Sequence, residues 1–255
     1  MRSLLGIILI GMLFESNPSF TTVKTYAAPE AKQAVAVDDT HFYAIDDALV
    51  AKYDFTGKQI AVWVASPESH IKHLNSGFIK DGKLYMAHSN YPDIPRTSTI
   101  EMLDTKTMKH EATHQFGTYD GAANVVLWHE DAWWVLFGHY SGTVAEPDRT
   151  AADTRLERLD KDWKRLDSFT FPEEVIRKFQ PKSISGAAFG PDGYLYCTGH
   201  DASEVYRLSL PKSGTVLTYD RTLPLACEGQ GIAWYGKYLY SIKRTTRQVV
   251  VSSIK

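Results

Sequence analysis

The chain has 255 residues, of which 44% are hydrophobic and 12% aromatic, and its formal net charge at pH 7 is −2. This length allows one or two domains with sizeable cores. Because positive and negative charges nearly balance, the composition gives no reason to expect binding to nucleic acid or to an anionic membrane surface. We expect a monomer whose partner is a small molecule or a glycan.

The N-terminus has the pattern of an export signal. Arg2 precedes an apolar run of about eleven residues, which is the length of a signal-peptide core and too short to cross a bilayer comfortably. We therefore expect residues 1–20 to be a signal peptide or an uncleaved anchor, and residues 21–255 to form one periplasmic or extracellular domain, with no other membrane insertion. In such a compartment Cys197 and Cys227 could form a disulfide; the alternative is two small residues buried on separate strands.

A pattern of two short strands joined by a polar turn recurs along the chain. An apolar strand leads into a turn with Asp, Gly or another charged residue, and then into a strand with aromatic residues or Leu-Tyr. The pattern occupies residues 33–47, 76–88, 124–139, 186–200 and 230–243. Three of these stretches are followed by a strand that ends in Asp54, Asp104 or Asp160 and a turn that contains Lys. The unit is thus four strands over roughly 45 residues, the spacing of propeller blades.

The repeat predicts an all-β fold, a five-bladed β-propeller with four-stranded blades. The last repeat lacks a strand, whereas residues 22–27 form a spare strand before the first repeat. We expect the spare N-terminal strand to complete the last blade and close the ring. The turn Gly190-Pro-Asp-Gly193 should place Gly193 at positive φ. Residues 172–180, with Pro first and acidic residues next, should form one short helix.

Polar residues gather in the loops that a propeller places on one face. His88, His139 and His200 end the second strand of three consecutive repeats, although aligning them requires shifts of one and two residues. Converging on one mouth of the channel, they could hold a divalent metal ion. They could instead act without metal as general base and acid. The third alternative is that they hydrogen-bond neighbouring loops and keep the blades in register.

Other residues of this face are candidates for substrate binding. They are His73, Asn75, Asn90, Tyr140, Asp201, Glu228, Gln230, Lys243 and Arg244. His73, Asn75 or Asp201 could complete a metal shell, and Lys243 or Arg244 could hold a carboxylate. Tyr91 and Tyr140 could stack on a sugar ring or simply pack their loops. The glycines on either side of Gln230 permit close approach by a ligand or by another stretch of backbone.

Several short segments of the sequence resemble those of a known family. They are residues 29–38, 73–77, 87–92, 138–140, 199–201 and 228–234, the last reading Glu-Gly-Gln-Gly-Ile-Ala-Trp. They resemble bacterial secreted β-propellers labelled cycloisomerase-like, after propellers that cyclise muconate. The resemblance implies the fold and brings no catalytic assignment, but the segments that carry it fall on the polar face deduced above.

Two functions follow as hypotheses. The first is an exported enzyme of isomerase, lactonase or lyase type, acting on a small acid or carbohydrate at a histidine-rich mouth. The second is a non-catalytic propeller that binds glycan or protein on the same face. Close convergence of the histidines would favour the first, whereas exposed aromatic rings would favour the second.

Overall fold

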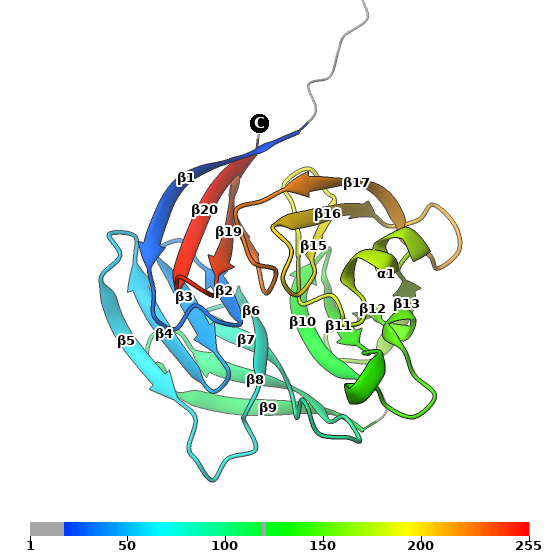
Figure 1. Ribbon diagram of the computed structural model, residues 1–255. Coiled ribbons are helices and arrows are strands. Elements are labelled where there is room, and N and C mark those ends of the chain that lie inside the picture. Colours follow the sequence, from blue (N-terminus) through cyan, green and yellow to red (C-terminus); the bar gives the residue numbers. More distant parts are fainter. Residues whose placement is uncertain (1–17, 119–120, 255) are drawn as a thin grey trace, which may run out of the picture.

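The computed structural model describes residues 18–118 and 121–254, so the predicted signal segment, residues 1–20, lies almost wholly outside the described residues. Five antiparallel sheets of four strands each surround a central axis, which confirms the five-bladed β-propeller (Figure 1). Among the described residues, no helix is long and apolar enough to span a membrane.

The four strands of each blade run in chain order from the channel outward, except that the outer strand of the last blade is the first strand of the chain. Blade I contains β2 (Ala34–Val37), β3 (His41–Asp46), β4 (Leu49–Asp54) and β5 (Gln59–Val64). Blade II contains β6 (Leu74–Lys80), β7 (Lys83–Ser89), β8 (Ser98–Asp104) and β9 (His110–Gly117). Blade III contains β10 (Ala122–His129), β11 (Ala132–Gly138), β12 (Arg155–Leu159) and β13 (Arg165–Thr170). Blade IV contains β14 (Gly186–Phe189), β15 (Leu195–Thr198), β16 (Glu204–Ser209) and β17 (Thr218–Pro224). Blade V contains β18 (Ala233–Tyr235), β19 (Tyr238–Lys243), β20 (Gln248–Ile254) and β1 (Phe20–Ala27).

The position of a strand in its blade follows from its sequence. The inner strand β14 reads Gly-Ala-Ala-Phe, because five strands crowd around one axis and leave room for small side chains there. The outer strands β5 and β13 are largely exposed; β13 carries charged and polar residues, whereas β5 is mainly apolar. The hydrophobic cores lie between neighbouring blades, as in the cluster that joins Trp134 of blade III to Tyr206 of blade IV.

The ring closes through the N-terminal strand, as predicted. β1 pairs antiparallel with β20 from Phe20 opposite Ile254 to Ala27 opposite Gln248, and Figure 1 shows the two strands side by side at the ends of the colour scale. Tyr26 is the buried residue of β1. Its ring lies 4.6 Å from that of Phe42, and its hydroxyl donates to Phe55 O at 3.1 Å. β1 therefore pairs with blade V through its backbone and packs against blade I through Tyr26.

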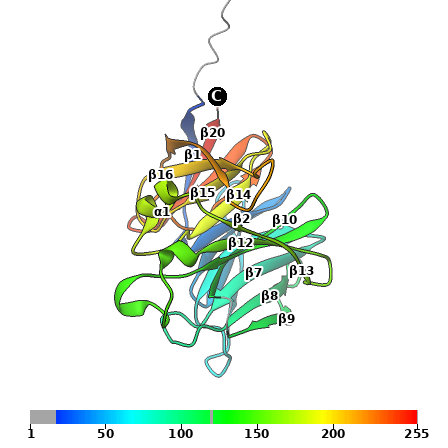
Figure 2. The ribbon, with the colours of Figure 1, turned by 90° about the vertical axis from the view of Figure 1, so that its right-hand side faces the viewer.

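Two further expectations concern single elements, and both are confirmed. Gly193 has φ of 78°, as the predicted turn requires. The predicted helix is α1 (Glu173–Phe179), which packs Val175 and Phe179 into the core shared by blades III and IV and lies alongside the strands of blade IV (Figure 2). Short 3₁₀ turns, Gly142–Val144 and Ala151–Asp153, occupy the long loop after β11.

The two cysteines do not pair. Cys197 and Cys227 are both buried free thiols, in the cores on either side of blade IV. Burial raises the pKa of Cys197 and raises that of Cys227 to about 11. Both therefore stay protonated at neutral pH and serve as small core residues.

Tyr26→Ala should lower the free energy of unfolding by about 3 kcal/mol, because a nearly buried ring and its hydrogen bond are removed. Val23→Ala is the matched control, since Val23 lies in the same strand, is 52% exposed, and should cost less than about 0.5 kcal/mol. Urea unfolding followed by circular dichroism measures both. Equally small effects would show that β1 does not hold the ring closed.

Gly193→Val should cost roughly 1–2 kcal/mol through backbone strain alone, because the left-handed region is unfavourable for a β-branched residue. No heavy atom lies within 4 Å of the added Cβ, so a steric clash does not contribute. Gly193→Asn is the control, since Asn tolerates this region and should be nearly neutral. If Gly193→Val had the same melting temperature as the wild type, the assignment of this turn would be wrong.

Candidate functional site

Each inner strand enters the channel at the same mouth with a polar side chain. There is one such residue per blade: Gln33, Asn75, Asn124, Ser185 and Gln230. In each blade, the residue four positions later lines a cavity at the opposite end of the channel. Together with His73, Tyr91, Tyr140, Lys182 and His200, the five polar residues line a cavity of about 50 Å³. We call this set of ten residues the polar mouth. It lies on the face that the sequence predicted.

The amides of the polar mouth also join neighbouring blades. Asn75 Nδ2 donates to Ala123 O at 2.9 Å, and Asn124 Nδ2 donates to Ile184 O at 2.8 Å. Each acceptor precedes the polar-mouth residue of the next blade along the ring. The amide groups are therefore held in fixed orientations by the same contacts that keep the blades in register.

Close backbone approach occurs around Gln230. Gln230 is 4% exposed and has φ of 70°. A Cβ added to Gly229 would lie 2.4 Å from Gly199 O, and one added to Gly231 would lie 3.0 Å from Ala34 Cα. The predicted role of the glycines in letting another stretch of backbone approach is confirmed, since only glycine fits these contacts.

Two histidines of the polar mouth are each backed by a carboxylate. His73 Nδ1 lies 2.9 Å from Asp47 Oδ1, and His200 Nδ1 lies 2.8 Å from Asp201 Oδ2. Among the described residues, Nε2 of neither ring has a hydrogen-bond partner. The hydrogen bond from His73 Nδ1 to Asp47 fixes the tautomer of that ring and leaves Nε2 as the nitrogen that can exchange a proton with a ligand. His200 Nδ1 lies beside the Asp201 carboxylate without a hydrogen bond, so this contact acts through charge.

The environment sets the charge state of these pairs. Burial lowers the pKa of His200 below its usual 6.5, and the Asp201 carboxylate opposes this effect only in part. Burial would raise the pKa of Asp47, but the contacts from His73 and Lys32 bring it well below its usual value. At neutral pH His200 is therefore uncharged, whereas the carboxylate behind His73 is ionised.

The cation of the polar mouth is Lys182. Its side chain is half-buried and forms no ion pair with any described residue. The predicted carboxylate clamps lie elsewhere: Arg244 is paired with Asp201 and donates to His200 O at 3.1 Å, and neither it nor Lys243 lines the cavity. Arg244 thus anchors the loop that carries His200.

The structure does not bring His88, His139 and His200 together. Among the described residues, the one group of three side chains with potential metal-binding atoms within 4.8 Å of one another contains His88 but neither of the others. His88 contacts Thr99 Oγ1 at 2.9 Å, and His139 Nδ1 lies 2.9 Å from Glu146 Oε2. These two histidines do not line the polar mouth.

Register explains the divergence. His88 lies within β7, His139 follows the last residue of β11 by one position, and His200 follows the last residue of β15 by two. Successive side chains of a strand point to opposite faces, so a shift of one residue reverses the direction of an imidazole. The shifts of one and two residues that were needed to align the three histidines between repeats therefore correspond to real differences in where their side chains lie.

Of the other predicted site residues, His73, Asn75, Tyr140 and Gln230 line the polar mouth, and Asn90, Asp201, Glu228, Lys243 and Arg244 do not. Asn90 accepts from Thr97 N at 2.8 Å and so shapes its own loop, while Glu228 accepts from Thr245 N at 2.8 Å. The predicted site residues do not include Gln33, Asn124, Lys182 or Ser185, which also line the polar mouth. The signal for three of them was their common position at the start of an apolar inner strand.

The tyrosines at the polar mouth pack against each other. Tyr140 is 8% exposed, burial raises its pKa to about 12, and its ring lies 5.2 Å from that of Tyr91. The fully buried Arg96 guanidinium lies 5.0 and 5.4 Å from the two ring centres and donates to Val144 O at 2.8 Å. Arg96 thereby ties the loop after β7 to the loop after β11, over one side of the mouth.

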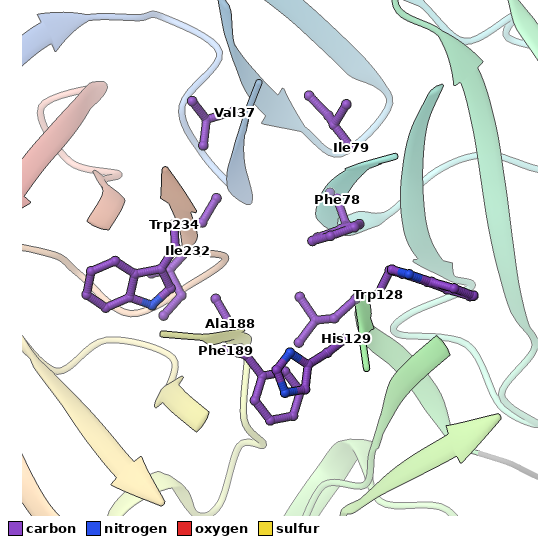
Figure 3. Close-up of a pocket in the computed structure, with 12 residues that line it drawn as sticks. Val37, Phe78, Ile79, Trp128, His129, Ala188, Phe189, Ile232 and Trp234 are labelled. Atoms are coloured by element: carbon purple, nitrogen blue, oxygen red, sulfur yellow. The ribbon is translucent and has the colours of Figure 1, made fainter. Parts of the chain in front are cut away.

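The other end of the inner strands is apolar. A cavity of about 210 Å³ there is lined mainly by aliphatic and aromatic side chains. Figure 3 shows Phe78, His129, Ala188 and Ile232 around its open centre, with His129 the polar exception. Its contrast with the polar mouth agrees with the expectation that chemically capable residues gather at one face.

Comparison with known proteins shows the fold. No family model and no curated protein matches the chain. Among solved structures, the PQQ-bound aldose sugar dehydrogenase of Streptomyces coelicolor matches with a TM-score of 0.59 at 12% identity, over 94% of this chain and 99% of the other. Hydrazine synthase of Kuenenia stuttgartiensis matches with a TM-score of 0.52 at 12% identity, over 96% and 98%. A luciferin-regenerating enzyme matches with a TM-score of 0.50 at 11% identity, over 94% and 95%. These likenesses are to β-propeller proteins, and the cycloisomerase-like resemblance stays a prediction.

The pKa of His200 should lie below 6.5 and should fall further in Asp201→Asn, because the carboxylate that favours the imidazolium is removed while burial and Arg244 remain. Titration of the ring nitrogens by long-range proton–nitrogen NMR measures the pKa in both proteins. A rise in the variant would show that Asp201 does not support the protonated ring.

Proposed function

We propose that the protein is an exported, monomeric enzyme that transfers protons to and from a small carboxylate-bearing molecule at the polar mouth. One observation carries the proposal: His73 and His200, each with Nδ1 against a carboxylate and Nε2 unpartnered among the described residues, line one small cavity with Lys182. Isomerases, lactonases and lyases need this combination of base, acid and anion anchor.

The two histidines have different roles in this proposal. His200 is the base, because its lowered pKa keeps it uncharged at neutral pH. His73 is the acid, because the ionised Asp47 beside Nδ1 favours the imidazolium, the form of the ring that can donate a proton from Nε2. His73 precedes blade II and His200 follows the second strand of blade IV, so a substrate between them meets base and acid from different walls.

Cavity size and charge limit the substrate. A volume of about 50 Å³ holds roughly three to five water molecules, so only the reacting end of a substrate can enter. The Lys182 ammonium would bind a carboxylate or stabilise an enolate as negative charge develops. The fixed amides of Asn75 and Asn124 supply further polar groups in defined positions.

Non-catalytic glycan or protein binding is the competing function. Stacking on a sugar needs exposed aromatic faces, and Tyr140 uses its ring for packing. The pairing of two histidines with carboxylates beside one cavity favours proton transfer over simple binding.

Solvent exchange can test the proposal before a substrate is known. The protein should accelerate deuterium incorporation next to the carbonyl or carboxylate of at least one member of a panel of small hydroxy, oxo and sugar acids and lactones in D₂O, followed by proton NMR. His200→Gln should lower this rate by roughly 10²–10⁴-fold. Lys182→Met should mainly raise KM, since it removes charge recognition and leaves the base intact.

The pH profile provides a second readout. The acidic limb of kcat/KM should lie below pH 6.5, because activity is lost as His200 becomes protonated through its lowered pKa. His114→Gln is the control, since His114 lies on β9 and stacks on Trp163 away from the mouth. Saturable binding of a panel member without exchange, hydrolysis or elimination would support the competing function instead.

A further inference from the structure

A second cluster of histidines surrounds a buried carboxylate in blade II. Glu101 of β8 is fully buried, and among the described residues no lysine or arginine pairs with it. Oε1 accepts from His70 Nε2 at 2.8 Å and Thr99 Oγ1 at 2.5 Å. Oε2 accepts from His110 Nε2 at 2.8 Å and Thr113 Oγ1 at 2.6 Å. A buried carboxylate is ordinarily paired with a cation or bound to a metal, and this one has imidazoles instead.

Three of these side chains have the spacing of metal ligands. His70, His88 and Glu101 each offer one ligand atom, and the three atoms lie within 4.8 Å of one another. Ligands about 2 Å from a tetrahedral ion lie roughly 3.3 Å apart. The contact of 2.8 Å from His70 Nε2 to Glu101 Oε1 lies close to that value, and the His70 and His88 rings lie edge to face with their centres 5.5 Å apart.

The hydrogen bonds fix the tautomer of His88. The Thr99 hydroxyl donates to Glu101, so His88 Nδ1 must donate to Thr99, and the lone pair of the ring is on Nε2. That nitrogen accepts only a long contact of 3.2 Å from Lys72 N, in the loop that also carries His70. The lone pair therefore points toward the segment that supplies the second imidazole.

We propose that His70, His88 and Glu101 bind a divalent transition-metal ion of the zinc type. Two imidazoles and one carboxylate are ligands that Zn²⁺ prefers, and three protein ligands leave one position open. Glu101 Oε2 accepts hydrogen bonds from His110 and Thr113, and these bonds fix the orientation of the carboxylate. His70 exposes 51% of its side chain, which gives the ion a path from solvent. Because no member of this group lines the polar mouth, the site is independent of the proposed proton transfer.

The bound ion would join two blades. His70 lies in the connection between β5 of blade I and β6 of blade II, whereas His88 and Glu101 lie on the middle strands of blade II. Binding to the folded state alone stabilises that state, so saturating metal should raise the melting temperature.

The test uses the full chain purified without a histidine tag and treated with EDTA. We expect one Zn²⁺ per chain by elemental analysis after dialysis, and a melting temperature raised by roughly 5–10 °C at saturating Zn²⁺. Co²⁺ in place of Zn²⁺ should give visible absorption bands typical of a tetrahedral site. His70→Ala should weaken Zn²⁺ binding at least 100-fold and abolish these bands while leaving the EDTA-treated protein folded, because His70 is half exposed.

The matched controls separate this site from other histidines. His200→Ala and His114→Ala should bind Zn²⁺ as the wild type does, since neither residue belongs to the group. Glu101→Gln should also lose the ion; if that variant fails to fold, His70→Ala decides alone. Wild-type binding weaker than about 100 μM, or His70→Ala with unchanged affinity and absorption bands, would overturn the proposal.

Discussion

Antiparallel pairing between the first and last strands is the interaction on which the rest of this molecule depends. β1 donates an outer strand to blade V, and Tyr26 reaches from it into the core that also contains Phe42 of blade I. Without that closure the ring would have an open edge between its ends. With it, the five inner strands are forced to start at one mouth of a single channel, and their first polar residues meet there.

The polar mouth is built from groups that serve structure and chemistry together. Asn75 and Asn124 point into the cavity and at the same time bond to the backbone of the next blade. His200 lines the cavity while its loop is anchored by Arg244. Such residues lose little conformational entropy when a ligand binds, because the fold has already fixed them.

The histidines at the channel mouth and in the loops beside it lie next to carboxylates. His73 is paired with Asp47 and His200 with Asp201 at the polar mouth, whereas His139 contacts Glu146 in the loop after β11. His88 lies beside Glu101 inside blade II. The chemistry open to each ring follows from what its second nitrogen faces: a cavity for the first two, and a neighbouring imidazole and loop for His88. The same type of residue can thus supply proton transfer at one place and metal binding at another.

The amino-acid sequence is sufficient to predict the fold, because the alternation of apolar strands with Asp-Gly and Lys-containing turns is a local signal that repeats. The closure, the helix at Glu173–Phe179 and the positive φ of Gly193 are also predictable from local patterns. Which polar residues meet depends on the tertiary structure. The direction of His88 depends on its register in β7, and the pairing of Glu101 with His70 and His110 joins segments 31 and 9 residues away in the chain. Side chains alternate across a strand and loops vary in length, so a shift of one position, invisible in the repeat pattern, selects which histidine faces the channel and which faces the core.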